Sequence, residues 1–245
     1  MAELLTIESL IALLTLSVLE IVLGIDNIIF ISILSNKLPE EKQRRARNIG
    51  LFLAMILRLG LLSLISVITQ MENDLFEIAG YGFSGRDLIL LAGGLFLIAK
   101  STSELGHKLK PKEHQEEQKN RAGATIGKVL IQIILLDLVF SLDSILTAIG
   151  LTDQVILMMI AVVISVGVMM LFSGAISRFI NNHPTLQVLA LAFLILIGFT
   201  LTLEVKAFSI HIPKGYIYFA VAFSLLVEFV NIKIRKPKDG KKNIA

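Results

Sequence analysis

Two segments of the sequence carry acidic side chains at the same spacing inside long apolar runs. Leu19–Phe30 reads LEIVLGIDNIIF and Leu136–Thr147 reads LDLVFSLDSILT. Four positions align at a constant offset of 117 residues: Glu20 with Asp137, Gly24 with Ser141, Asp26 with Asp143, and Asn27 with Ser144. If the apolar runs cross a membrane, each charged side chain at the bilayer centre costs about 2.5–3.5 kcal/mol. These acids must therefore face one another, a cation or water.

The side chains in the two segments offer only oxygen ligands: carboxylates, an amide and a hydroxyl. Such ligands suit Mg²⁺, Ca²⁺ or Mn²⁺, whereas zinc and copper usually bind His or Cys. The chain has no cysteine and four histidines, all of them in predicted loops. A divalent cation would also relieve the repulsion between clustered carboxylates. We therefore predict a metal-binding set of six residues: Glu20, Asp26, Asn27, Asp137, Asp143 and Ser144.

The alternative for the acids is a set of ion pairs with basic residues inside the membrane. Arg58 and Lys100 lie within apolar runs, but two bases cannot neutralise four acids plus Glu228. Arg58 could pair with an acid and lock two helices, or repel a competing cation, and we favour the pairing role. Lys100 is close enough to a predicted span end to reach water. Glu228 could line an exit path or lie at a solvated helix end.

Gly24 and Ser141 occupy matching places between the acids of the two segments. Residues six apart lie about 240° apart around a regular helix, so Glu20 and Asp26 would not share a face. Glycine tolerates local unwinding, and serine can bond back to the backbone. We therefore predict a kink or break at Gly24 and Ser141 that turns both acids of each segment inward.

Long apolar runs recur along the whole chain, which is 55% hydrophobic and has a mean hydropathy of +0.79. Runs of about 18 or more such residues predict membrane-spanning helices. Seven spans are predicted, at Leu10–Leu34, Ile49–Thr69, Leu88–Ser103, Ile126–Gly150, Val155–Ile176, Leu186–Leu203 and Tyr216–Ile234.

Lysine and arginine are concentrated in alternate loops of this arrangement. They fill the loop between spans one and two, the segment 105–125 between spans three and four, and the C-terminal tail. Because cytoplasmic loops carry an excess of Lys and Arg, this pattern predicts an outside N-terminus and a cytoplasmic C-terminus. An odd number of spans is required for those two ends, in agreement with the seven predicted. The small positive net charge lies in these loops, so no nucleic-acid partner is predicted.

The two acidic segments fall in the first and fourth spans, so they cross the membrane in opposite directions. We predict an all-α transmembrane domain over residues 1–245 built as an inverted repeat of three plus three helices. Repeat 1 covers about 10–104, a charged cytoplasmic loop covers 105–125, and repeat 2 covers about 126–204. A seventh helix, 216–234, is added. Inverted repeats are typical of secondary transporters, whose site lies near the bilayer midplane.

The chain resembles the TerC family of integral membrane proteins along nearly its whole length. The two acidic segments carry the resemblance, together with RDLILLAGGLFLIAKSTSE at Arg86–Glu104, HPTLQVLALAFLILIGFTL at His183–Leu201 and HIPKGYIYFAVAFSLLVE at His211–Glu228. It resembles the short bacterial members without an appended soluble domain. The resemblance implies a seven-helix fold of the LysE-type exporter superfamily, efflux of metal ions (manganese in several members), and a bacterial inner-membrane location. It also implies that the acids at positions 20, 26, 137 and 143 are functional.

These observations together predict a secondary transporter that exports a divalent cation, most strongly Mn²⁺, with protons as the candidate coupling ion. The cation is cargo, and no prosthetic group is predicted. An enzyme is not expected, because intramembrane aspartyl hydrolases need one reactive pair with shifted pKa values rather than symmetric sets of acids. Two alternatives stay open: a chaperone-like partner in membrane assembly, and an exporter of a small organic cation. The sequence leaves the oligomeric state open.

Overall fold

The computed structural model describes residues 6–65, 67, 73–78, 80–109, 125–149, 152, 154–208, 210 and 212–235. This part of the chain is mostly helical, and it also contains a two-stranded hairpin. The seven long helices are α1 (Ile7–Ser35), α2 (Glu40–Ser63), α4 (Gly85–Leu109), α5 (Ile126–Ile149), α6 (Val155–Asn182), α7 (Pro184–Leu203) and α8 (Lys214–Arg235). The chain divides into two compact units, Met1–His211 and Ile212–Ala245.

Six helices of the described chain, α1, α2, α4, α6, α7 and α8, are long and apolar enough to cross a membrane. The first unit exposes large apolar side chains around its rim, where a soluble protein would be polar. Leu14, Ile131 and Leu171 are 68%, 60% and 81% exposed, on three different helices. A soluble monomer rarely exposes apolar surface on this scale, whereas lipid tails would cover it. The fold is therefore that of a helical membrane protein.

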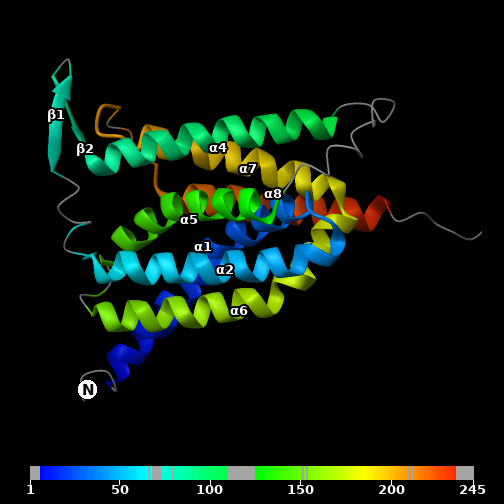
Figure 1. The fold of residues 1–245 in the computed structure, drawn as a ribbon, viewed down its shortest axis with the longest axis horizontal. Helices are drawn as coiled ribbons and strands as arrows, with labels where there is room; N and C mark the ends of the chain where they lie inside the picture. Colours follow the sequence, from blue (N-terminus) through cyan, green and yellow to red (C-terminus); the bar gives the residue numbers. More distant parts are fainter. Residues whose placement is uncertain are drawn as a thin grey trace, which may run out of the picture. The chain divides into compact units, whose positions relative to one another are not determined.

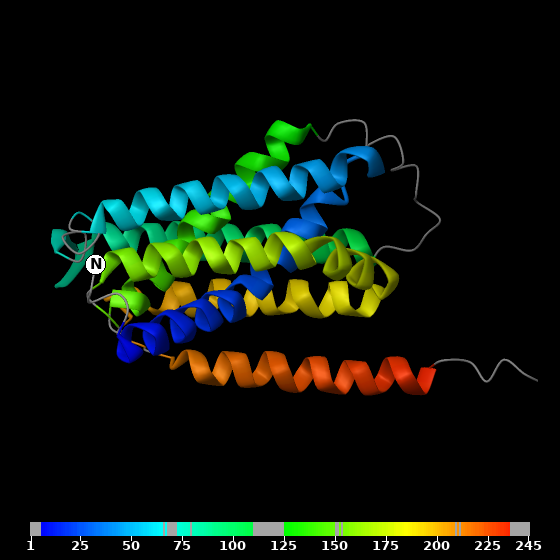
Figure 2. The same cartoon turned by 90° about the horizontal axis from the view of Figure 1, so that it is seen from below.

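The helices of the first unit pack in pairs that link the two halves of the chain. α1 packs on α6, α2 packs on α5 and α6, and α4 packs along α7. Figures 1 and 2 show α4 beside α7 and α2 beside α6. α1 begins at the left of Figure 1, whereas α5 begins at the right, so the two helices run in opposite directions. The acidic segments are thus brought into one bundle from opposite ends.

Glycines allow α4 and α7 to approach closely. A Cβ added at Gly198 would lie 2.8 Å from the carbonyl oxygen of Gly94 and 3.0 Å from Cβ of Leu97. A Cβ added at Gly94 would in turn lie 2.6 Å from the carbonyl oxygen of Gly198. Such contacts are typical of membrane helices, which rely on small residues at their interfaces.

We expect Gly198→Ala to destabilise the protein by about 1–3 kcal/mol, the usual cost of overpacking a well-packed interface. The added methyl group meets backbone of α4, which can move only by separating the helices. The matched control is Gly167→Ala in α6, where an added Cβ meets nothing within 4 Å. Thermal unfolding in detergent should show a lower Tm for Gly198→Ala than for Gly167→Ala. Equal Tm values would contradict this account of the α4–α7 contact.

Several predicted boundaries were wrong, because helices continue beyond the apolar runs that revealed them. α2 begins at Glu40, nine residues before its predicted start at Ile49, and the charged segment EEKQRRAR is helical. α4 continues to Leu109, so the first residues of the predicted loop 105–125 are helical, and residues 110–124 lie outside the described part. Hydropathy marks where lipid would lie, whereas backbone hydrogen bonding continues into the aqueous ends.

The expectation of purely helical structure was also wrong in one place. β1 (Asp74–Ile78) pairs antiparallel with β2 (Tyr81–Ser84). The rings of Phe76 and Phe83 stack with centroids 5.6 Å apart, and Gly80 takes a φ of +83° in the turn. Aromatic residues on both sides of a glycine turn favour a hairpin, a local signal that hydropathy does not carry.

Candidate functional site

One basic residue joins the two acidic segments in the interior of the first unit. Arg58 of α2 is 3% exposed, and its guanidinium pairs with Glu20 of α1 and with Asp137 of α5. Arg58 Nη1 donates to Glu20 Oε2, and Arg58 Nη2 donates to Asp137 Oδ1 at 3.0 Å. Glu20 and Asp137, which are 4% and 6% exposed, are therefore bridged by one side chain. We call Glu20, Arg58 and Asp137 the charge cluster.

Ser141 completes the hydrogen bonding of the charge cluster. Its hydroxyl donates to Asp137 Oδ2 at 3.0 Å and accepts from Arg58 Nε at 3.1 Å. Asp137 and Ser141 are four residues apart on α5, so both point to the same face of the helix. The planar guanidinium uses three donors at once, which an ammonium group at this position could not match geometrically. This network positions the carboxylate of Asp137 from two sides.

Two further residues of the predicted metal set lie beside the cluster. Asn27 Nδ2 of α1 approaches Asp137 Oδ1 at 3.5 Å, at the long limit of a hydrogen bond. The Ser144 hydroxyl donates to the carbonyl oxygen of Ser141 at 3.2 Å, within its own helix. Glu20, Asn27 and Asp137 therefore come from the two acidic segments into one region, as the sequence predicted. The hydroxyl of Ser144 is engaged by backbone rather than directed to a shared ligand.

The side chains of Asp26 and Asp143 lie outside the described part of the structure. Their backbones belong to α1 and α5, directly before Asn27 and Ser144. Among the described side chains, no three His, Cys, Asp or Glu groups are close enough to form a metal site. The metal-ligand roles of the predicted set stay predictions.

The helices are not broken at Gly24 or Ser141, and the kink that the sequence offered as the alternative stays a prediction. α1 is helical from Ile7 to Ser35 and α5 from Ile126 to Ile149, without interruption at either position. A Cβ at Gly24 would collide with the Met169 side chain, so this glycine admits close packing of α6 on α1. The Ser141 hydroxyl is used by Asp137 and Arg58 and does not bond back to its own backbone. Sequence reasoning missed this bridging role; the spacing of four indicated the bond to Asp137, but not the one from Arg58.

The sequence left open the roles of Arg58, Lys100 and Glu228, and the structure places these residues in different parts of the chain. Arg58 is an ion-pair residue, as favoured. Lys100 lies in α4 and takes no part in the hydrogen bonds described for the charge cluster. Glu228 belongs to α8 in the second unit, where Asn231 Nδ2 lies 3.5 Å from Glu228 Oε2.

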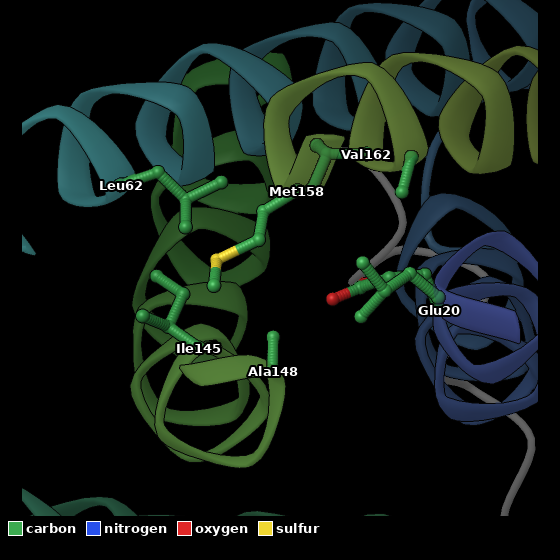
Figure 3. Close-up of a pocket in the computed structure, with 8 residues that line it drawn as sticks. Glu20, Leu62, Ile145, Ala148, Met158 and Val162 are labelled. Carbon is green, nitrogen blue, oxygen red and sulfur yellow. The ribbon is translucent and has the colours of Figure 1, made fainter. Parts of the chain in front are cut away.

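The charge cluster has one side that is not tightly filled. A small pocket borders Glu20, and the other described residues of its lining are seven apolar ones from α1, α2, α5 and α6. Figure 3 shows the Glu20 carboxylate directed toward this pocket, with Ile145, Ala148 and Met158 across from it. With both acids ionised, the cluster carries two negative charges and one positive charge. A cation would therefore be attracted to this region.

Comparison with known proteins agrees with the architecture. Residues 5–242 match the "Integral membrane protein TerC family". The chain is 50% identical over 229 residues to a UPF0053 protein of Haemophilus influenzae, covering 94% of this chain and 95% of that protein. It is 52% identical over 225 residues to the UPF0053 inner membrane protein YgdQ of Escherichia coli K12, covering 92% of each.

A longer relative shares the same region. The UPF0053 inner membrane protein YoaE of Escherichia coli K12 is 50% identical over 219 residues, which cover 89% of this chain and 42% of YoaE. No solved structure matches the chain. The extent of the family match, the named relatives and the long apolar helices lead to one conclusion: the chain belongs to the TerC family of integral membrane proteins and is a multi-pass protein of the inner membrane.

Proposed function

We propose that this protein is a secondary transporter that exports a divalent metal cation, Mn²⁺ above all, from the cytoplasm. The observation that carries the proposal is the buried charge cluster, in which two acids from oppositely directed helices meet at one guanidinium. Ionisable residues inside a membrane protein are costly and usually mark ion or substrate pathways. A purely structural helix contact would not need two acids for one base.

The packing of the helices supports an inverted repeat as the machinery of transport. In an inverted repeat, α1 corresponds to α5, α2 to α6 and α4 to α7. The α1–α6 contact then corresponds to the α5–α2 contact, and both are present. The same correspondence leaves the α4–α7 and α2–α6 contacts in place. We propose seven spans with the N-terminus outside, and alternating access between the two repeats, as in other transporters of this design.

The chemistry of the cluster supports a cation as cargo. In the structure Arg58 supplies one positive charge to Glu20 and Asp137. We propose that a divalent cation brings two charges to the region, held by Asp26 and Asp143 with Asn27, Glu20 and Asp137 nearby. Carboxylate and amide oxygens match Mn²⁺, Mg²⁺ and Ca²⁺. Clustered carboxylates also exchange a cation for protons, which makes protons the proposed coupling ion.

Ion flux in proteoliposomes tests the proposal. We expect purified wild-type protein to move Mn²⁺, and to move it faster than Mg²⁺, Ca²⁺ or Zn²⁺, with a rate that depends on a pH gradient. Protein-free liposomes are the control for leakage. No flux of any of the four ions from well-folded protein, with and without a pH gradient, would overturn the proposal. That result would favour an organic cation as cargo or a role in membrane assembly.

A further inference from the structure

The pocket beside Glu20 lies on one side of the charge cluster along the three helices that contribute to the cluster. Leu16 precedes Glu20 in α1, Leu62 follows Arg58 in α2, and Ile145 and Ala148 follow Asp137 in α5. Met158 stands in the first turns of α6. Figure 1 shows these helix ends on the left, where α1 begins and where the hairpin lies. The pocket thus separates the cluster from that face, which is the outer one in the proposed orientation.

The two repeats differ at this point in the size of one side chain. At the offset of 117 residues, Ile145 of the pocket corresponds to Ile28, and Ala148 corresponds to Ile31. Ile28 and Ile31 are 3% and 4% exposed, so the inner counterpart holds a large, buried side chain where the outer side holds a methyl group. Because Ala148 is smaller than its counterpart Ile31, space remains on the outer side of the cluster.

The lining of the pocket is suited to a closed passage. Among the described residues of the lining, Glu20 is the one polar side chain, and the opposite wall is formed by side chains such as Leu62, Ile145 and Met158. Figure 3 shows Met158 reaching into the space across from Glu20. An apolar constriction blocks hydrated ions because water leaves it, and it conducts once it widens. Unbranched Met side chains change conformation readily, which suits a part that must open.

We propose that this pocket is the closed outer section of the cation's path, through which the cation passes from the Glu20 side of the charge cluster to the outer face. Leu62, Ile145 and Met158 are the gate, and Ala148 provides the space in which the gate opens. The inference rests on the proposed transport function and orientation. It adds a route and a gate that neither of them specifies.

Cysteine accessibility tests the proposal directly, because the chain contains no natural cysteine. In sealed vesicles of known orientation, Ala148→Cys should lose its free thiol to a membrane-impermeant methanethiosulfonate reagent added from the outer face. The same reagent added from the inner face should leave the thiol free. Ala190→Cys is the matched control, since Ala190 is also buried but lies on α7 outside the pocket. It should stay unreactive from both faces.

A second variant tests the space itself. Ala148→Ile copies the inner repeat at Ile31 and should abolish Mn²⁺ flux while the purified protein keeps its folded elution profile. If Ala148→Cys is unreactive and Ala148→Ile moves Mn²⁺ at the wild-type rate, the passage is overturned and the transport proposal stands. Reaction from the inner face alone would overturn the outward placement. Outer-face reaction of Ala148→Cys without flux of any tested cation would support the passage and overturn Mn²⁺ as cargo.

Discussion

Arg58→Gln is expected to lower the free energy of unfolding by about 3–5 kcal/mol, the usual cost of breaking a buried ion pair from one side. Arg58 is the shared partner of Glu20 and Asp137, all three of which are nearly inaccessible. Without it, two carboxylates face each other with no countercharge. Ser141 alone can satisfy only part of what the guanidinium provided. The effect is expected to be larger than that of any single replacement of an acid in the cluster.

Unfolding of the purified protein in mixed micelles, followed by circular dichroism, measures this effect. Glu20→Gln is the matched comparison, because it leaves Arg58 paired with Asp137 and Ser141. It should be much less destabilised than Arg58→Gln. The double variant Glu20→Gln with Arg58→Gln should recover part of the loss, since one of the two stranded charges is gone. If Arg58→Gln and Glu20→Gln unfold alike, the bridging role of Arg58 is wrong.

Arg58→Lys separates charge from geometry. A lysine retains the positive charge but cannot donate in fixed directions to Glu20, Ser141 and Asp137 together. We expect it to be more stable than Arg58→Gln and less stable than the wild type. Full recovery by lysine would mean that charge alone, rather than the three-way bridge, holds α1, α2 and α5 together.

Asp26→Asn and Asp143→Asn are expected to abolish metal flux while the protein still inserts and folds. Each change removes one charged ligand from the proposed cation site and replaces it with a side chain of the same size. Loss of a group that merely orients a metal ligand costs about 10–100-fold in affinity or activity, so loss of a ligand should cost at least as much. Proteoliposome flux of Mn²⁺ measures the effect, and the folded elution profile of the detergent-purified variants checks insertion and folding.

Glu8→Gln is the matched control for these variants. Glu8 is also an acid of α1, but it is exposed in the first turn of the helix. It should transport at the wild-type rate. Wild-type flux in both Asp26→Asn and Asp143→Asn would remove these two residues from the site. The charge cluster would then have to hold the cation without them.

The sequence was sufficient for the membrane class, the approximate helices and the two acidic segments. These features are local, because hydropathy, repeated spacing and polar residues in apolar runs can be read along one stretch of chain. The aligned positions at 20 and 137 and at 27 and 144 indicated that two distant segments share a role. The structure brings Glu20, Asn27 and Asp137 together and so agrees with that reading.

The tertiary structure alone decided how these residues are used. Arg58 is 38 residues from Glu20 and 79 from Asp137, and no local pattern selects it as the partner of both. Gly24 looked like a helix break because a glycine in a helix has two explanations, flexibility and close packing, and only the position of Met169 distinguishes them. Hydropathy and spacing act along the chain, whereas ion pairs and helix contacts depend on which faces of α1, α2, α5 and α6 meet in space.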